Sequence, residues 1–158
     1  MNAMNKVWVI GDASVDLVAE KQDRYLKCPG GASANVSVCV ARLGGRCGFI
    51  GCLGDDEAGH FLRQVFQDNA VDVSFLRHDA ALTSAVLIVN LASDGERSFT
   101  YLVHPGADTF VSPADLPAFR PHEWFYFSSI GLTDQPAREA CLEGAKRARE
   151  AGSYVLFD

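Results

Sequence analysis

The sequence predicts an α/β domain built from strand–helix units and carrying a β-hairpin lid. Apolar runs at residues 7–10, 47–53 and 124–127 are each followed by a glycine or serine and, further on, by a helical pattern. A β-rich pair of segments around Asp94-Gly95 interrupts this series and predicts a hairpin that projects from the main body. With 158 residues, 48% of them hydrophobic, the chain can form one domain with a sizeable core.

Charge and composition exclude several functional classes. The formal net charge is -6 and no basic cluster is present, so a nucleic-acid or anionic membrane surface is not expected. No apolar run of ~18 residues predicts a membrane span, and no signal segment opens the chain, so we expect a cytoplasmic protein. The five cysteines show no C-x-x-C spacing and are expected to be small buried apolar residues rather than zinc ligands.

The first strand, residues 7–10, is followed by two carboxylates, Asp12 and Asp16. Ligands of open α/β sheets bind outside the carboxyl ends of strands, where such carboxylates accept hydrogen bonds from ligand hydroxyls. The alternative is that one carboxylate caps the turn and the other is solvated. That alternative is weaker for Asp16, because its neighbours are apolar.

A glycine-rich loop opens the first predicted helix. Residues 21–27 are polar and predict a connection or an edge strand, and Gly30 and Gly31 then allow a tight turn and close approach by another molecule. We expect free backbone N–H groups at the helix start, with the Asn35 amide able to reach a ligand there. The alternative is an ordinary turn before a core helix. The expected apolar positions of the helix, which ends at glycine, are Val36, Cys39, Val40 and Leu43.

A second strand and helix follow. Residues 47–53 predict a buried strand, and the acids at 55–57 suit the first turn of a helix, where we expect them to cap rather than to bind metal. The four histidines show no ligand spacing and are expected in turns or on the surface. The helix has its apolar face at Phe61, Leu62, Val65 and Phe66, and a short strand is expected at 71–75.

Residues 83–91 and 97–103 predict the two arms of the hairpin, joined by a turn at 92–96. Phe99 and Tyr101 share one face of the second arm and are placed to close over a ligand. The alternative is that these aromatic side chains pack on their own domain or on a second subunit.

The remaining elements complete the series. Ser112-Pro113 predicts a helix start, and residues 124–127 an aromatic buried strand. A helix at 136–151 ends at Gly152, and residues 154–158 begin another buried strand. Since this strand leaves the sheet without its next unit, we expect the chain to be the N-terminal part of a longer protein and its exposed edge to promote association.

Several nucleotide-binding and hydrolase motifs are absent from the sequence. It contains no G-x-x-x-x-G-K-[ST] loop, no G-x-G-x-x-G after the first strand and no G-x-S-x-G elbow. A generic dinucleotide-binding domain is therefore disfavoured.

Residues 30–37 (GGASANVS), with Gly44 and Gly54 downstream, resemble the first signature of the ribokinase (PfkB-type) carbohydrate kinases. Residues 11–16 (GDASVD) are similar to the start of the same family, and the resemblance covers the whole chain. Within the family the motifs are most similar to those of bacterial fructokinase-like aminoimidazole riboside kinases.

The resemblance implies a ribokinase-like three-layer α/β/α sandwich, of which residues 1–158 form the N-terminal part, with lid elements at about 16–28 and 83–104. It implies transfer of the ATP γ-phosphate to a hydroxymethyl group of a furanose, with fructose and aminoimidazole riboside as competing substrates. The implied substrate-binding residues are Asp16 as a bidentate hydroxyl acceptor, Asp12 assisting it, Gly30 and Gly31 allowing the sugar against the backbone, Asn35 on another hydroxyl, and Tyr101 packing from the lid.

One family signature is missing. The G-A-G-D segment, which in the family provides the anion hole and the catalytic base, does not occur in these 158 residues. We therefore expect no catalytic, cofactor or metal residues in this chain, and an inactive chain in isolation. The resemblance implies ATP, Mg²⁺ and K⁺ as cofactors of a full-length parent that dimerises through the lid. The alternative is a non-catalytic sugar-binding or regulatory module.

Overall fold

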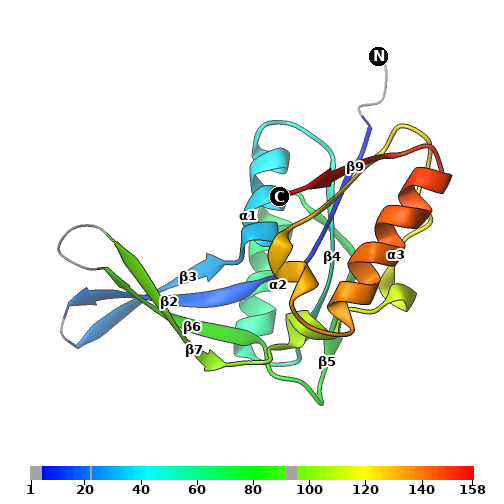
Figure 1. Ribbon diagram of the computed structural model, residues 1–158. Helices are drawn as coiled ribbons and strands as arrows, with labels where there is room; N and C mark the ends of the chain where they lie inside the picture. Colours follow the sequence, from blue (N-terminus) through cyan, green and yellow to red (C-terminus); the bar gives the residue numbers. More distant parts are fainter. Residues whose placement is uncertain (1–4, 22, 92–95) are drawn as a thin grey trace.

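A parallel sheet forms the centre of the molecule in the computed structural model, which describes residues 5–21, 23–91 and 96–158. Within these residues the strand order is β5-β4-β1-β8-β9, and every neighbouring pair is parallel (Figure 1). The strands are β1 (Val7–Ile10), β4 (Cys47–Gly54), β5 (Asp72–Asp79), β8 (Trp124–Phe127) and β9 (Tyr154–Phe157).

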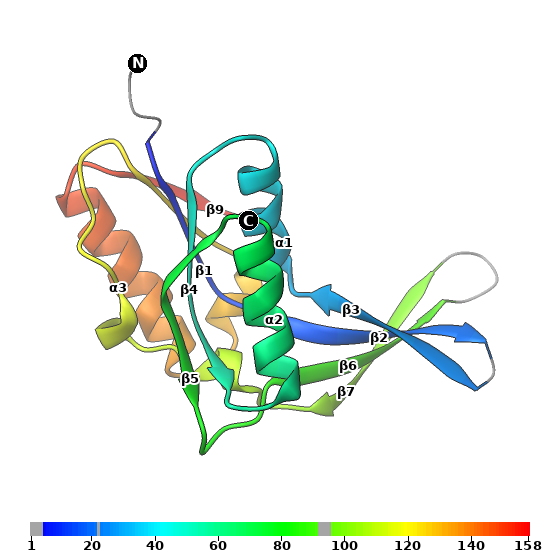
Figure 2. The ribbon, with the colours of Figure 1, turned by 180° about the vertical axis from the view of Figure 1, so that it is seen from behind.

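Helices cover both faces of this sheet, as Figures 1 and 2 show from opposite sides. Helices α1 (Ala32–Arg42) and α2 (Glu57–Asp68) share one apolar cluster with Val9 and Phe49, whereas α3 (Ala137–Glu150) shares another with Trp8 and Ile50. Successive strand residues alternate between the two clusters, because side chains of a strand point to opposite faces. The expected three-layer α/β/α sandwich is confirmed. No helix among the described residues combines the length and the apolar character needed to cross a bilayer.

A second sheet of four strands projects from one side of the body and forms the lid. Its order is β3-β2-β6-β7, with antiparallel hairpins β2–β3 and β6–β7 joined by the parallel pair β2–β6. The predicted hairpin is therefore confirmed, while residues 92–95 of its predicted turn lie outside the described part. The sequence did not predict the strand after residue 13. The lid strands are β2 (Ser14–Lys21), β3 (Arg24–Gly30), β6 (Ala85–Leu91) and β7 (Arg97–Val103).

Three short 3₁₀ segments lie in the connections between strands and helices. η1 (Ala107–Phe110) and η2 (Pro113–Asp115) lie between β7 and β8, and η3 (Ser129–Leu132) lies between β8 and α3. The predicted start at Ser112 is present as a capping box with Asp115, but only one 3₁₀ turn follows it. Pro117 and Pro121 lie just beyond, and proline lacks the N–H that a continuing helix needs.

The buried face of α1 differs from the prediction. Its buried residues are Ser33, Ala34 and Ser37, whereas Cys39 and Leu43 are exposed. The Ser37 hydroxyl donates to Ala34 O at 2.7 Å, which satisfies its polar group inside the core. Val36 and Val40, two of the four predicted positions, are partly buried and pack against the core, so the prediction fails only for Cys39 and Leu43. Small side chains form the most buried face and let the helix lie close to the sheet. The α2 prediction is correct, because Leu62 and Phe66 are buried.

The cysteines are buried in three of five cases. Burial raises the thiol pKa of Cys47 and Cys141 to about 12 and that of Cys52 to about 11, so these thiols are unreactive. Cys28 is half-buried and Cys39 exposed, which corrects the expectation for these two.

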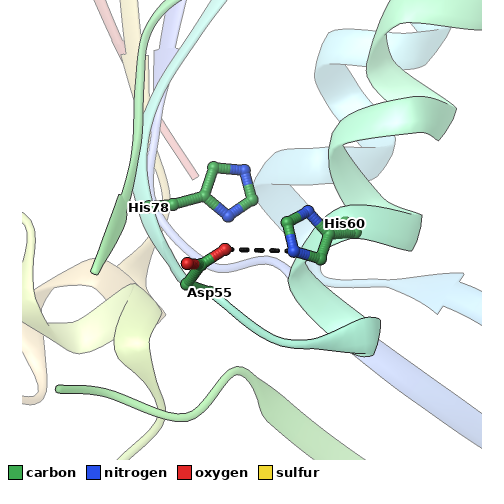
Figure 3. A group of neighbouring side chains, drawn as sticks. All are labelled: Asp55, His60 and His78. Atoms are coloured by element: carbon green, nitrogen blue, oxygen red, sulfur yellow. Dashed lines mark ion pairs between the residues drawn. The ribbon is translucent and has the colours of Figure 1, made fainter. Parts of the chain in front are cut away.

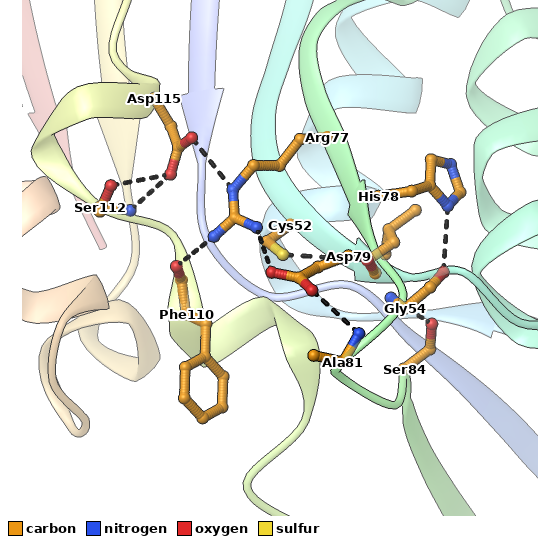
Figure 4. A network of polar contacts seen from close by, with 11 residues as sticks. Cys52, Gly54, Arg77, His78, Asp79, Ala81, Ser84, Phe110, Ser112 and Asp115 are labelled. Carbon is orange, nitrogen blue, oxygen red and sulfur yellow. Dashed lines mark hydrogen bonds and ion pairs between the residues drawn. The ribbon is translucent and has the colours of Figure 1, made fainter.

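The Arg77 guanidinium ties β5 to the 3₁₀ segments (Figure 4). Its Nη1 lies 3.0 Å from Asp79 Oδ2, its Nε 3.1 Å from Asp115 Oδ1, and its Nη2 donates to Phe110 O at 2.8 Å. Three acceptors on three segments thus share one planar donor group.

Candidate functional site

A cavity of about 700 Å³ lies between the lid and the carboxyl ends of β1 and β8. This is the edge at which open α/β sheets bind ligands. The end of β1, the start of α1, the inner face of the lid, residues 104–109 and the segment after η3 all contribute to its lining.

Asp12 lines the cavity and also caps the N-terminal end of α1. Its carboxylate accepts hydrogen bonds from the backbone N–H groups of Ala32 (2.6 Å) and Ser33 (3.1 Å), and its carbonyl accepts from Ala34 N at 3.2 Å. Since Asn35 N donates to Gly31 O, the first four N–H groups of the helix all have partners. The expectation of free N–H groups at this helix start is therefore wrong, because Asp12 occupies them.

Asp16 is held on β2 with its carboxylate at the cavity wall. Its Oδ1 accepts a hydrogen bond from the Ser14 hydroxyl at 2.9 Å. Burial raises the pKa of Asp16, the Ser14 hydrogen bond opposes this, and the negative charge of Asp12 adds to it. The carboxylate is thus partly desolvated and forms no salt bridge with the described residues, which suits an acceptor for ligand hydroxyls.

The two loop glycines have different structural roles. A Cβ on Gly30 would overlap the Asp16 carboxylate, so this glycine leaves the space that the carboxylate fills, although Gly30 does not itself line the cavity. Gly31 has a φ of +102°, and a Cβ there would overlap the backbone of Asp12 and Ala13. Gly31 and the exposed Asn35 both line the cavity.

Tyr101 lines the cavity from the lid. It pairs with Leu87 on β6, which in turn pairs with Asp16 on β2, so the three side chains share one sheet face. The Tyr101 ring lies 5.0 Å from the His104 ring and is half exposed. The structure thus brings five of the six predicted residues to one cavity, and their roles in binding stay predictions.

Several lining residues were missed from the sequence. His104, Asp108 and Thr109 follow the hairpin, and Thr133 and Asp134 precede α3. Asp108 is half-buried, its Oδ1 atom is buried with no partner among the described residues, and desolvation raises its pKa to about 6, with the charge of Asp12 adding to the shift. The H-P-G-A-D run at 104–108 carries no motif that marks such a carboxyl; only the fold turns it inward.

The cavity's polar groups suit a neutral polyhydroxyl ligand better than a metal ion. Among the described residues, the sole group of three close histidine, cysteine or acidic side chains lies outside the cavity. The cavity instead pairs carboxylates with an aromatic lid, an arrangement that binds hydroxyls on one side and a ring face on the other.

Comparison with known proteins agrees with this arrangement. A sequence model described as "pfkB family carbohydrate kinase" matches residues 4–158. The chain is 85% identical to the aminoimidazole riboside kinase of Salmonella typhimurium (strain LT2) over 100% of this chain and 50% of the relative. It thus spans about half the length of the curated relatives it matches.

Two solved structures with bound ligands match this chain over about half of their own length. The aminoimidazole riboside kinase of Salmonella enterica, complexed with aminoimidazole riboside and an ATP analogue, has a TM-score of 0.91 and 81% identity over 98% of this chain and 50% of that one. A double mutant of the Vibrio cholerae fructokinase, bound to fructose, ADP and potassium, has a TM-score of 0.94 and 44% identity over 100% and 51%. The family match over nearly the whole chain, together with the lid and cavity, shows that the chain belongs to the pfkB family of carbohydrate kinases.

Proposed function

We propose that this chain is the substrate-recognition half of a cytoplasmic kinase that transfers the ATP γ-phosphate to the hydroxymethyl group of a furanose. The observation that carries the proposal is the Asp16 carboxylate, positioned by Ser14 and by the space at Gly30, opposite Tyr101 in one cavity. A carboxylate of this kind accepts two hydrogen bonds from neighbouring sugar hydroxyls. Asn35 adds a donor and an acceptor, and Gly31 leaves its backbone open to close contact.

Aminoimidazole riboside is the substrate that we favour, with fructose as the alternative. The relative with 85% identity carries that kinase name, whereas the fructokinase structure is 44% identical. The aromatic side of the cavity, with Phe99, Tyr101 and His104, also suits a planar base. Fructose has no planar base, so these aromatic side chains would contribute less to its binding.

Catalysis requires parts that these 158 residues do not provide. Phosphoryl transfer depends on positioning the phosphates and on neutralising the charge that develops on them. The cavity is lined by the carboxylates of Asp12, Asp16, Asp108 and Asp134, and among the described residues Arg97 is the one arginine or lysine in its lining. We therefore propose that ATP, Mg²⁺ and K⁺ bind through a further segment that contains the G-A-G-D signature, and that the 158-residue chain alone does not transfer phosphate.

The lid also supports a homodimer. Leu26, Phe99 and Tyr101 are more than half exposed and lie on the same face of the lid sheet as Leu87 and Val89. An apolar face that extends past its own cavity is typical of an interaction surface. We propose that the lid of a second copy covers it in the full-length protein.

A phosphorylation assay on the full-length protein tests the function. Aminoimidazole riboside, fructose, ribose and adenosine are each offered with ATP, Mg²⁺ and K⁺. We expect turnover of aminoimidazole riboside that falls at least about 100-fold in Asp16→Asn, because hydrogen bonds to a charged group are lost, and stays unchanged in Asp68→Asn, an exposed aspartate on α2. Sugar binding without turnover of any substrate would instead favour a non-catalytic module.

A further inference from the structure

Asp55, His60 and His78 converge outside the cavity, where β4 enters α2 (Figure 3). One potential ligand atom from each residue, an imidazole nitrogen or a carboxylate oxygen, lies within 4.8 Å of the other two. His60 Nε2 is 3.0 Å from Asp55 Oδ1, and the rings of the two histidines stack with centroids 5.1 Å apart. None of these residues lines the cavity.

We propose that this trio, Asp55–His60–His78, is a binding site for a divalent first-row transition metal of the zinc class. Two imidazoles and one carboxylate are a ligand set that zinc, cobalt and nickel accept, with a fourth position left to water. Magnesium and calcium prefer oxygen ligands throughout, whereas two of the three side chains here offer imidazole nitrogens. The proposal is independent of the kinase function.

Backbone hydrogen bonds and strand pairing hold the main chain of all three residues in place without a metal. Asp55 N donates to Asp79 O at 3.2 Å, and His60 N donates to O of Asp56, the N-cap of α2, at 2.9 Å. His78 lies in β5, in register with Leu53 of β4. A site on such elements loses little conformational entropy when it binds.

His78 faces Asp55 through Nδ1, the ring nitrogen bonded to Cγ, and this nitrogen also lies 3.0 Å from Gly54 O. A metal at the trio would therefore take His78 through Nδ1 and replace its contact with Gly54 O. The Nε2 atom, which is buried with no partner among the described residues, lies on the side of the ring away from Asp55.

The distances require only a small adjustment. Metal–nitrogen and metal–oxygen bonds near 2.0–2.2 Å put tetrahedral ligands about 3.3 Å apart. The Asp55–His60 separation of 3.0 Å already meets this, and the limit of 4.8 Å for the third ligand is within reach of a side-chain rotation.

Neighbouring acids offset the positive end of α2, which would otherwise oppose a cation. Asp56 is engaged with the backbone, accepting from Gly59 N at 2.7 Å and Ser84 N at 2.8 Å. Asp55 points away from these donors toward His60. The acids at 55–57 thus divide their roles: Asp56 caps, as the sequence predicted, whereas Asp55 lies against His60. His60 is on the surface, as expected, while His78 lies in strand β5 rather than in a turn.

The test is a titration of the reduced, metal-free chain with Co²⁺, followed by visible absorption, and with Zn²⁺, followed by calorimetry. We expect one ion per chain, weakened at least tenfold in His60→Gln and in Asp55→Asn. Both residues are exposed, so these variants should fold, and melting in EDTA checks this. The matched control is His122→Asn, which changes a distant histidine at a φ of +67° that asparagine tolerates.

A second readout is the unfolding temperature. Zn²⁺ at a large excess over its Kd should raise it in the wild-type chain and in His122→Asn but not in His60→Gln, because a ligand that binds only the native state stabilises it. Binding that is equal in all variants, absent altogether, or marked by intense cobalt–thiolate charge-transfer bands would overturn the proposal; those bands would locate the ion at the cysteines.

Discussion

At the scale of single residues, the site depends on space left beside one carboxylate. Asp16 has its raised pKa because burial desolvates it, yet it fits between strands only because Gly30 has no side chain. The Asp12 carboxylate, by contrast, accepts hydrogen bonds from the first backbone N–H groups of α1. The two aspartates that look equivalent in the sequence therefore differ: Asp16 keeps acceptor capacity for a ligand, and Asp12 mainly organises the backbone.

Replacing Gly30 by alanine should displace the Asp16 carboxylate without a backbone conflict at Gly30 itself. We expect KM for the furanose to rise roughly 10- to 100-fold in the full-length protein, as for lost hydrogen bonds to a charged group. Steady-state kinetics measures this, with Gly44→Asn as control, because Gly44 has nothing within 4 Å of its Cβ position and lies at φ +85°. An unchanged KM would mean that Asp16 does not bind the sugar.

Asp108 should make stability depend on pH. Its pKa is about 6 in the folded chain against 3.8 for the free side chain, so the folded state holds the proton longer than the unfolded state. Its ionisation therefore costs folded stability as pH rises from about 4 to about 6, by ~3 kcal/mol at most. Urea unfolding of wild type and Asp108→Asn should show the variant gaining in relative stability between pH 4 and 7.5. A constant difference would contradict the burial of this carboxyl.

At the scale of elements, apolar periodicity predicts the strands and helices that bury a regular apolar face. It misses those whose position depends on pairing with segments distant in sequence. Strands β1, β4 and β8 and helix α2 follow from their apolar spacing. Strand β2 does not, because Asp16 interrupts its apolar run and one of its two pairing partners, β6, is distant in sequence. Likewise, no local spacing joins His60 on α2 to His78 on β5, so their contact becomes visible only in the fold. The buried face of α1 consists of small residues for a similar reason, because it is set by close packing against the sheet and not by local spacing.

Arg77 links β5 to η1 and η2, and lysine cannot reproduce its planar set of donors. We expect Arg77→Lys to lower the free energy of unfolding by about 1–2 kcal/mol, a typical cost of breaking a polar network. Chemical denaturation measures this. The control Arg149→Lys alters an exposed arginine on α3 and should have no effect. Equal stability of both variants would show that the three contacts of Arg77 do not stabilise the fold.

At the scale of the whole molecule, the body and the lid enclose a cavity, while the β9 edge of the central sheet exposes apolar side chains. Tyr154, Leu156 and Phe157 of β9 are 46–60% exposed, and β9 pairs only with β8 among the described strands. The family and the three-layer architecture could be predicted from the sequence because signature residues 30–37 and the strand–helix order are local features. The contribution of residues 104–109 and 130–137 to the cavity depends on how distant segments meet, and the sequence does not reveal it.

The open edge should make the 158-residue chain self-associate. We expect concentration-dependent elution in sizing chromatography, reduced by Leu156→Glu together with Phe157→Glu, because charges on an edge strand oppose pairing. Leu43→Glu serves as control, since Leu43 is 87% exposed at the C-cap of α1, away from the edge. A monomer at all concentrations, or an equal effect of Leu43→Glu, would show that β9 is not responsible.

The parallel pairing of β2 with β6 has a consequence for the order of folding. Each lid hairpin closes a short loop, but the two hairpins meet through residues about 70 positions apart, such as Ser14 and Ala85. The intervening chain contains α1, β4, α2 and β5. Long-range pairing pays its loop-closure entropy before it gains contacts, unless the intervening units have already shortened the loop. The four-stranded lid should therefore assemble late, after the β4–α2–β5 unit has docked on β1, and the cavity beneath it should be the last part of the chain to form.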